Sequence, residues 1–393
     1  MSPRRAGWHF LQLPGPSNVP ERVLRAMSRP TIDHRAVDFP TLTHEVLEGL
    51  RGVFRTTGHV LVYPASGSGG WEAALANSLN PGNHVLMFET GFFALGWADT
   101  ARRFGLRVDL VPGDWRRGVD PGVVEQRLRA DSDHRICAVA VVHNETSTGA
   151  VSRIADIRKA IDQARHPALL LVDAISSLGS IEYRHDEWGV DVTVAASQKG
   201  LMLPPGLAFH AVSERAIEAS RSATLPRAYF DWQRMLSFNE EGYFPYTPAT
   251  NLLFGLREAL VMLSEEGLDS VLNRHALLAE ATRQSVRAWG LQTQCIPAEE
   301  QSNVLTAIVM PDGYDADQFR RLVYDRFDMS LGAGLGRLKG KVFRIGHVGD
   351  FNELMLAGTL AGVEMGLALS GVPIEQVGVS AALRWLVHHG GAA

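Results

Sequence analysis

One lysine in this sequence stands where an amine could do chemistry. The chain has four lysines among its 38 Lys and Arg residues, and only Lys199 follows an apolar, strand-like segment, in "VTVAASQKGLMLPPG" (192–206). A buried lysine is costly and is usually there for its chemistry. The alternative is a lysine at a strand end whose ammonium group reaches solvent. The local sequence leaves both interpretations open.

An acid stands in a matching position. Asp173 ends the apolar segment "ALLLVD" (168–173), and in an open parallel sheet ligands bind at the carboxyl ends of the strands. An acid and a lysine at neighbouring strand ends favour pyridoxal phosphate. The lysine forms a Schiff base with its aldehyde, and the acid keeps the ring nitrogen protonated. The alternative is a buried Asp–Lys ion pair.

A glycine-rich loop supplies a possible phosphate site. In "YPASGSGGWEAALA" (63–76), Ser66, Gly67 and Ser68 separate a predicted strand from a predicted helix. Hydroxyls and amides at a helix start bind anions, although a plain turn explains the same pattern. No Gly-Lys-Ser/Thr follows, and Ser66 replaces the first glycine of a nucleophile elbow. A nucleotide-binding P-loop and a serine hydrolase are therefore disfavoured.

Two further side chains could serve such a site. Thr146, in "VVHNETSTGAV" (141–151), follows a predicted strand, where its hydroxyl would contact the cofactor ring or cap the next helix. Arg344 lies within the apolar strand "KVFRIGHV" (341–348). Its planar fork suits a substrate carboxylate, and the alternatives are an internal salt bridge or an arginine on an edge strand. We interpret His347 as structural rather than as a base.

The elements that would position these residues alternate regularly. Apolar, strand-like segments are separated by helical patterns, which predicts an α/β fold with a mainly parallel seven-stranded sheet covered on both faces. The predicted strands are 59–64, 84–89, 106–112, 136–143, 168–175, 191–197 and 207–212.

The pattern changes after about residue 220. The segment 225–250 is aromatic and irregular, and a long helical stretch over 250–289 is broken near Gly267. Shorter strands follow at 303–310 and 341–348, and we interpret the glycine run "LGAGLGRLKG" (331–340) as a flexible loop. We expect a large domain with the N-terminal segment over 1–266 and a small α+β domain over 267–393.

Composition excludes several classes of protein. The chain of 393 residues is 46% hydrophobic and 21% charged, which is typical of a soluble globular protein. A net charge of −5 gives no basic face for nucleic acid, and no apolar run is long enough to span a membrane. Pro14 and Pro16 interrupt the N-terminal apolar patch, so no signal peptide is expected. Cys137 and Cys295 lack metal-ligand spacing, so we expect core thiols, no metal site and a cytoplasmic protein.

Taken together, these motifs resemble the class-V, fold-type I aminotransferases, most closely the serine–glyoxylate and alanine–glyoxylate group. The resemblance runs nearly end to end, from "LPGPSNVP" (13–20) to "GKVFRIGHVGD" (340–350). Its most specific part is "SQKG" (197–200) together with "VDAISS" (172–177) and "FRIGHVG" (343–349).

The resemblance implies pyridoxal 5′-phosphate as cofactor and assigns a role to each matching residue. Lys199 would hold the cofactor covalently, Asp173 would pair with its ring nitrogen, and Arg344 would bind the substrate carboxylate. The remaining cofactor contacts would be Ser66, Gly67, Ser68 and Gln198 around the phosphate, Thr146 near the ring hydroxyl, and Phe93 against the ring.

Part of the site would come from a second subunit. Thr247, in "FPYTP" (244–248), would reach the phosphate of the neighbouring subunit's cofactor, and either Tyr243 or Tyr246 would lie near it. The resemblance therefore implies a homodimer, and in some members a tetramer.

The implied reaction moves an amino group from L-serine to glyoxylate and yields glycine and hydroxypyruvate, with Lys199 carrying the proton. Ser68 and Phe93 replace a histidine and a tryptophan of animal-type alanine–glyoxylate members, which favours serine as the donor. A small pocket closed by the N-terminal segment would suit glyoxylate. Aspartate, alanine and ureidoglycine are the alternative donors. A cysteine desulfurase-type lyase needs a nucleophilic cysteine on a mobile loop, and neither Cys137 nor Cys295 matches that need.

Overall fold

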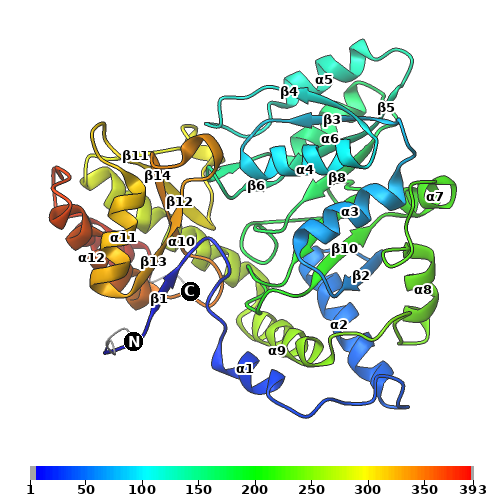
Figure 1. The fold of residues 1–393 in the computed structure, drawn as a ribbon, viewed down its shortest axis with the longest axis horizontal. Helices are drawn as coiled ribbons and strands as arrows, with labels where there is room; N and C mark the ends of the chain where they lie inside the picture. Colours follow the sequence, from blue (N-terminus) through cyan, green and yellow to red (C-terminus); the bar gives the residue numbers. More distant parts are fainter. Residues whose placement is uncertain (1–5, 391–393) are drawn as a thin grey trace.

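The computed structural model describes residues 6–390, and the largest of the three sheets in this range has seven strands and lies in the core of the larger part of the chain (Figure 1). Only β10 runs antiparallel to its neighbours, so the predicted mainly parallel sheet of seven strands is confirmed. Its strands, in spatial order, are β2 (His59–Tyr63), β10 (Ala208–Val212), β9 (Val192–Ala196), β8 (Leu169–Asp173), β5 (Ile136–Val142), β3 (His84–Phe88) and β4 (Arg107–Val111).

Helices flank this sheet (Figure 1). Each buries an apolar stripe against it or a neighbouring helix. In α6, for example, Ile154, Ile157 and Ile161 recur at helical spacing and are all buried. The helices are α1 (Glu21–Met27), α2 (Phe39–Phe54), α3 (Gly67–Ser78), α4 (Phe92–Arg103), α5 (Pro121–Ala130), α6 (Ile154–Gln163), α7 (Glu214–Ser222), α8 (Trp232–Glu240) and α9 (Thr250–Glu266).

The predicted break in the long helical stretch is confirmed. Helix α9 ends at Glu266, and α10 (Leu268–Ala288) begins after Gly267, whose φ of +81° is rarely adopted by other residues. Helix α10 leads into the second part of the chain, which ends with α11 (Ala316–Phe327), α12 (Glu353–Leu369) and α13 (Gly378–His389).

The second sheet includes the beginning of the chain. Its order is β1 (Phe10–Gln12), β13 (Met329–Ala333), β14 (Val342–Gly346), β12 (Leu305–Val309) and β11 (Gln292–Thr293). Strand β1 pairs in parallel with β13, and Figure 1 shows it in blue beside this sheet. The sequence predicts that the N-terminal segment belongs to the large domain, whereas in the structure β1 lies in the smaller sheet.

Two predictions about irregular segments were wrong. The glycine run 331–340 is not a flexible loop, because its first residues lie in β13 and Gly336–Leu338 form a 3-10 turn. Glycine is needed there for close packing: a Cβ on Gly332 would lie 2.9 Å from the Cβ of Arg344. The segment 225–250 is also not irregular throughout, because it contains α8, which Asp231 caps by accepting from the backbone amide of Arg234.

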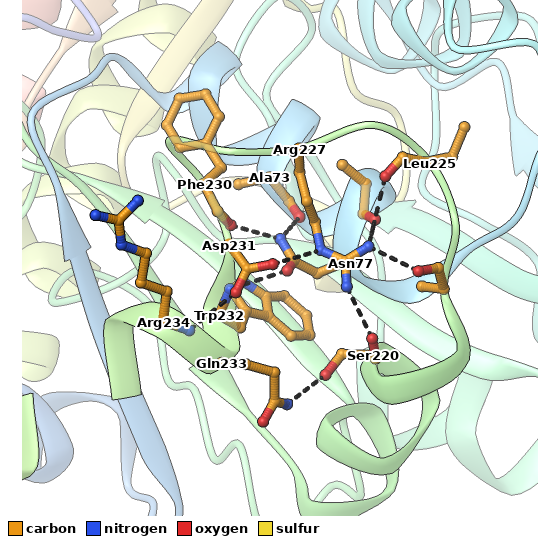
Figure 2. A network of polar contacts seen from close by, with 12 residues as sticks. Ala73, Asn77, Ser220, Leu225, Arg227, Phe230, Asp231, Trp232, Gln233 and Arg234 are labelled. Atoms are coloured by element: carbon orange, nitrogen blue, oxygen red, sulfur yellow. Dashed lines mark hydrogen bonds and ion pairs between the residues drawn. The ribbon is translucent and has the colours of Figure 1, made fainter. Parts of the chain in front are cut away.

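The polar network in Figure 2 fixes the C-terminal end of α3. The side-chain amide of Asn77 donates to the carbonyls of Ala73 and Phe230, and its oxygen accepts from the backbone amide of Trp232. Arg227 donates to the carbonyl of Ala76 from the same loop. These contacts hold in place the helix whose first turn carries the predicted phosphate loop.

Residues 6–390 contain neither a membrane-spanning helix nor a metal-binding cluster of side chains. No helix in this range is long and apolar enough to cross a membrane. Nor do three or more His, Cys, Asp or Glu side chains in this range come together in a way that could hold a metal ion.

Candidate active site

A cavity of about 120 Å³ lies where the central strands of the large sheet end. It brings together most of the residues singled out in the sequence, together with several that sequence reasoning missed. The predicted residues in its lining are Ser66, Gly67, Ser68, Phe93, Thr146, Asp173, Gln198 and Lys199. The others are Trp71, Val142, Asn144, Ile175 and Ser176.

Lys199 is held in the interior. It follows β9 by three residues and is only 9% exposed, so the interpretation in which its ammonium reaches solvent is wrong. Burial, assisted by the positive charge of Arg344, lowers the pKa of its amine to about 8, against the opposing effect of Asp173. The amine is therefore far closer to its nucleophilic, neutral form than an ordinary lysine is.

The N-terminal segment covers this lysine. The amine donates to the carbonyl oxygen of Pro14 at 2.8 Å, and the Ser17 hydroxyl donates to the backbone carbonyl of Lys199 at 3.0 Å. Gly15 has a φ of +118°, and a Cβ at this position would lie 2.2 Å from the lysine nitrogen. A side chain at residue 15 would therefore displace the amine, and the N-terminal segment packs directly against Lys199.

Asp173 is buried at the end of β8 and oriented by two donors. The indole N–H of Trp71 donates to one carboxylate oxygen and the backbone amide of Ile175 to the other, both at 2.8 Å. Burial raises the pKa of Asp173 to about 7, despite these two hydrogen bonds. Within residues 6–390 no ion pair joins Asp173 to Lys199, so the alternative of a buried structural pair is wrong.

The start of α3 has the features of an anion site. Ser66 is the residue that precedes the helix, yet its hydroxyl makes no capping hydrogen bond, and within residues 6–390 the backbone amides of Gly67 and Ser68 have no hydrogen-bond partner. The side-chain oxygen of Gln198 is buried without a partner. Gly67 packs so tightly that a Cβ would lie 2.4 Å from the side chain of Ile175.

Hydroxyl and amide groups form the wall near β5. The Thr146 hydroxyl and the Asn144 amide both donate to the hydroxyl of Ser176 at 2.8 Å. The Asn144 side-chain oxygen is buried and has no partner, so this wall can accept a further hydrogen bond from a bound molecule.

Arg344 approaches from β14 and carries a charge that no carboxylate neutralises. It is 7% exposed, and it donates to the carbonyls of Ala333 at 2.8 Å and Thr146 at 2.7 Å. No ion pair involves Arg344 within the described chain, and β14 lies between β13 and β12, so the alternatives of an internal salt bridge and of an edge-strand arginine are both wrong. Burial lowers the pKa of its guanidinium to about 10, against the effect of Glu145. A buried, unpaired guanidinium is suited to bind a carboxylate brought by a ligand.

The tyrosines and threonine predicted near the phosphate lie elsewhere in the subunit. Tyr246 donates to the carbonyl of Val62 at 3.2 Å and stacks on Tyr229, with ring centroids 4.2 Å apart. Tyr243 stacks on Phe39, and Thr247 is exposed. None of them lines this cavity, so their contact with the cofactor of a neighbouring subunit stays a prediction.

Neither cysteine lines the cavity. Cys137 lies within β5, and burial raises the pKa of the Cys295 thiol to about 12, so it is a poor nucleophile. The geometry gives no support to a desulfurase-type reaction.

The residues present fit pyridoxal phosphate. A buried amine, an oriented carboxylate and an unpaired helix start line one cavity, and its buried orphan oxygens need a bound molecule to satisfy them. Of the residues missed, Trp71 had a signal in the sequence, because it lies one helical turn after Gly67 and so shares its face. Asn144 and Ser176 had no such signal.

Comparisons with known proteins agree with this geometry. The family model for class-V aminotransferases matches residues 9–335. The serine–glyoxylate aminotransferase of Methylorubrum extorquens is 51% identical over 390 residues, covering 98% of this chain and 97% of that protein. The L-aspartate–glyoxylate aminotransferase of Paracoccus denitrificans is 44% identical over 364 residues, covering 92% of each. The crystal structure of ureidoglycine–glyoxylate aminotransferase from Bacillus subtilis superposes with a TM-score of 0.89 at 28% identity, covering 98% of this chain and 99% of that one.

Proposed function

The chain belongs to the class-V aminotransferases, and from that premise we propose that it transfers the amino group of L-serine to glyoxylate, yielding hydroxypyruvate and glycine. The observation that carries the choice of donor is the similarity to a serine–glyoxylate aminotransferase along nearly the whole chain.

The cofactor determines what the surrounding residues must do. Pyridoxal phosphate, when bound, supplies an aldehyde for the amino group and a ring that withdraws electrons from the substrate α-carbon. The start of α3 and Gln198 would hold its phosphate, and Asp173, held by Trp71 and Ile175, would face the ring nitrogen. The protonated ring nitrogen would be a cation beside Asp173. Its positive charge would favour the ionised carboxylate and so offset the cost of burying that charge.

Lys199 is the residue that moves the proton. Its lowered pKa allows the amine to accept a proton from the substrate α-carbon near neutral pH and to return it at the next step. Arg344 would bind the substrate carboxylate and so orient the α-carbon toward this amine. The segment around Pro14 excludes water above Lys199, which strengthens both interactions.

The donor is tested by direct comparison. We expect L-serine to give a higher kcat/KM than L-alanine, L-aspartate or ureidoglycine with glyoxylate as acceptor, with hydroxypyruvate as the product. Aspartate is the second candidate, because the Paracoccus denitrificans relative named for it is 44% identical. A higher kcat/KM for aspartate than for serine would refute the serine proposal and leave the family assignment intact.

We also infer that the protein acts as a homodimer in the cytoplasm. Thr247 is exposed, which leaves it available to a second subunit, and both cysteines are unpaired. Sedimentation analysis should give twice the monomer mass, and Thr247→Ala should weaken cofactor retention. A monomer with full activity would contradict this inference.

A further inference from the structure

Glu145 is a fully buried carboxylate with no role in the reaction described above. It ends the short strand β6 (Asn144–Glu145), which pairs with β7 (Ala150–Val151) to form a hairpin beside the cavity. Its side chain is 0% exposed, and within residues 6–390 it forms no ion pair. Its charge acts on Arg344, but no salt bridge holds it in place, so its position calls for a further explanation.

The carboxylate is bound by the start of α4. One oxygen accepts from the backbone amide of Ala94 at 3.0 Å, and the other accepts from that of Phe93 at 3.4 Å. The positive end of the helix dipole favours a negative charge at this place. Helix α4 has Gly91 as its preceding residue and therefore has no capping side chain of its own. Glu145 supplies that cap from a different element.

The neighbouring contacts hold the carboxylate in one orientation. The Ser147 hydroxyl donates to it at 2.7 Å and accepts from the backbone amide of Phe92 at 2.9 Å. A Cβ on Gly91 would lie 2.4 Å from the Glu145 Cγ, so the glycine leaves the room that this side chain occupies. The first residues of α4 are thus fastened to the hairpin at three successive amides.

Phe93 is the residue that this arrangement presents to the cofactor. It lies in the first turn of α4, is half-buried, and lines the cavity. The same hairpin carries Thr146, whose carbonyl accepts from Arg344. We propose that Glu145 is a positioning residue: its carboxylate fixes the start of α4 so that the ring of Phe93 stays against the bound cofactor.

The test measures cofactor binding rather than turnover, so its result does not depend on which amino donor is used. Glu145→Gln keeps the shape of the side chain, but its NH2 group cannot accept a hydrogen bond from a backbone amide. Pyridoxal 5′-phosphate is titrated into cofactor-free protein, with Glu145→Gln compared in the wild-type and the Phe93→Leu backgrounds. Visible circular dichroism of the bound cofactor reports its ring environment.

We expect Glu145→Gln to weaken cofactor binding about tenfold in the wild-type background, as for the loss of charge-assisted hydrogen bonds, and to reduce the circular dichroism band. In the Phe93→Leu background the same change should alter the dissociation constant less than about twofold, because both changes act through one ring. An equal effect in both backgrounds, or no effect in either, would overturn the proposal.

Two further variants complete the design. Glu300→Gln is the control, because Glu300 is also buried and accepts from a backbone amide, that of Gly118, but forms no hydrogen bond to the start of α4. It should leave the dissociation constant unchanged. If Glu145→Gln does not fold, Glu145→Asp, which keeps the charge and shortens the side chain, is measured in the same two backgrounds and judged by the same criterion. Failure here would leave the serine–glyoxylate proposal untouched.

Discussion

The lowered pKa of Lys199 predicts how fast the cofactor-free protein takes up pyridoxal phosphate at different pH values. Only the neutral amine attacks the aldehyde. A pKa of about 8 in place of the usual 10.5 corresponds to about 3 kcal/mol in favour of the neutral form. At pH 7.5 this makes the neutral fraction roughly a quarter, compared with about one part in a thousand for an ordinary lysine. The structure therefore predicts that Lys199 takes up pyridoxal phosphate at pH 7.5 about two hundred times faster than a lysine with the usual pKa would.

The sign of the pH dependence follows from the direction of the shift. Because the pKa of the buried amine is depressed, the charged form predominates below about pH 8 and the neutral form above it. Stopped-flow absorbance should show the uptake rate rising through a midpoint near pH 8 and then reaching a plateau. A midpoint near pH 10, or a rate independent of pH, would refute the reasoning.

A variant tests one of the two causes of this shift. Arg344 lowers the pKa of Lys199 by its positive charge, so Arg344→Gln should move the midpoint of uptake to higher pH. Arg337→Gln is the control, because Arg337 also lies in the second part of the chain but contacts Trp115 and the carbonyl of Gly113 instead. It should leave the midpoint unchanged, and an equal shift in both variants would show that Arg344 has no specific effect.

Three further predictions follow from the same geometry. Asp173→Asn should lower kcat about 10²–10³-fold in steady-state assays, because it removes a preorganised electrostatic partner of the cofactor ring. The variant should still bind the cofactor. An unchanged kcat would show that the Asp173 carboxylate does not act on the ring. Arg344→Lys keeps the positive charge but loses the planar guanidinium, so kcat/KM for glyoxylate should fall roughly 10–100-fold, which corresponds to about 1.5–3 kcal/mol. Cofactor binding should not change. An unchanged kcat/KM would place the substrate carboxylate elsewhere. Gly67→Ala brings a Cβ within 2.4 Å of the Ile175 side chain, so about 1–3 kcal/mol of strain should weaken cofactor binding in an equilibrium titration. Gly52→Ala, where a Cβ would meet nothing within 4 Å, should leave binding unchanged; equal binding in both variants would show that Ile175 yields.

Much of the large sheet could be predicted because its signal is local. Strands such as β8 are buried along their whole length and therefore read as continuous apolar segments, and Gly267 marked the break between two helices. Lys199 and Asp173 were found because charged residues that interrupt or end such segments are unusual, and strand ends place them at one edge of the sheet.

The parts that could not be predicted depend on contacts between distant segments. Strand β1 is three residues long and acquires its partner, β13, only in the folded chain. The glycine run that contains part of β13 looked flexible because the reason for Gly332, close packing on Arg344, lies on a neighbouring strand. Glu145 was missed for the same reason, since the helix that it caps begins far from it in the sequence.

The central claim is that this site accepts the amino group of L-serine and passes it to glyoxylate. The most direct test is a visible absorption spectrum of the purified protein, recorded before and after adding L-serine without an acceptor. We predict that the yellow band of the lysine-bound cofactor is replaced by the near-ultraviolet band of pyridoxamine phosphate, and that glyoxylate restores the yellow band. A yellow protein whose spectrum L-serine does not change would contradict the choice of donor. A protein that takes up no pyridoxal phosphate would contradict the account as a whole.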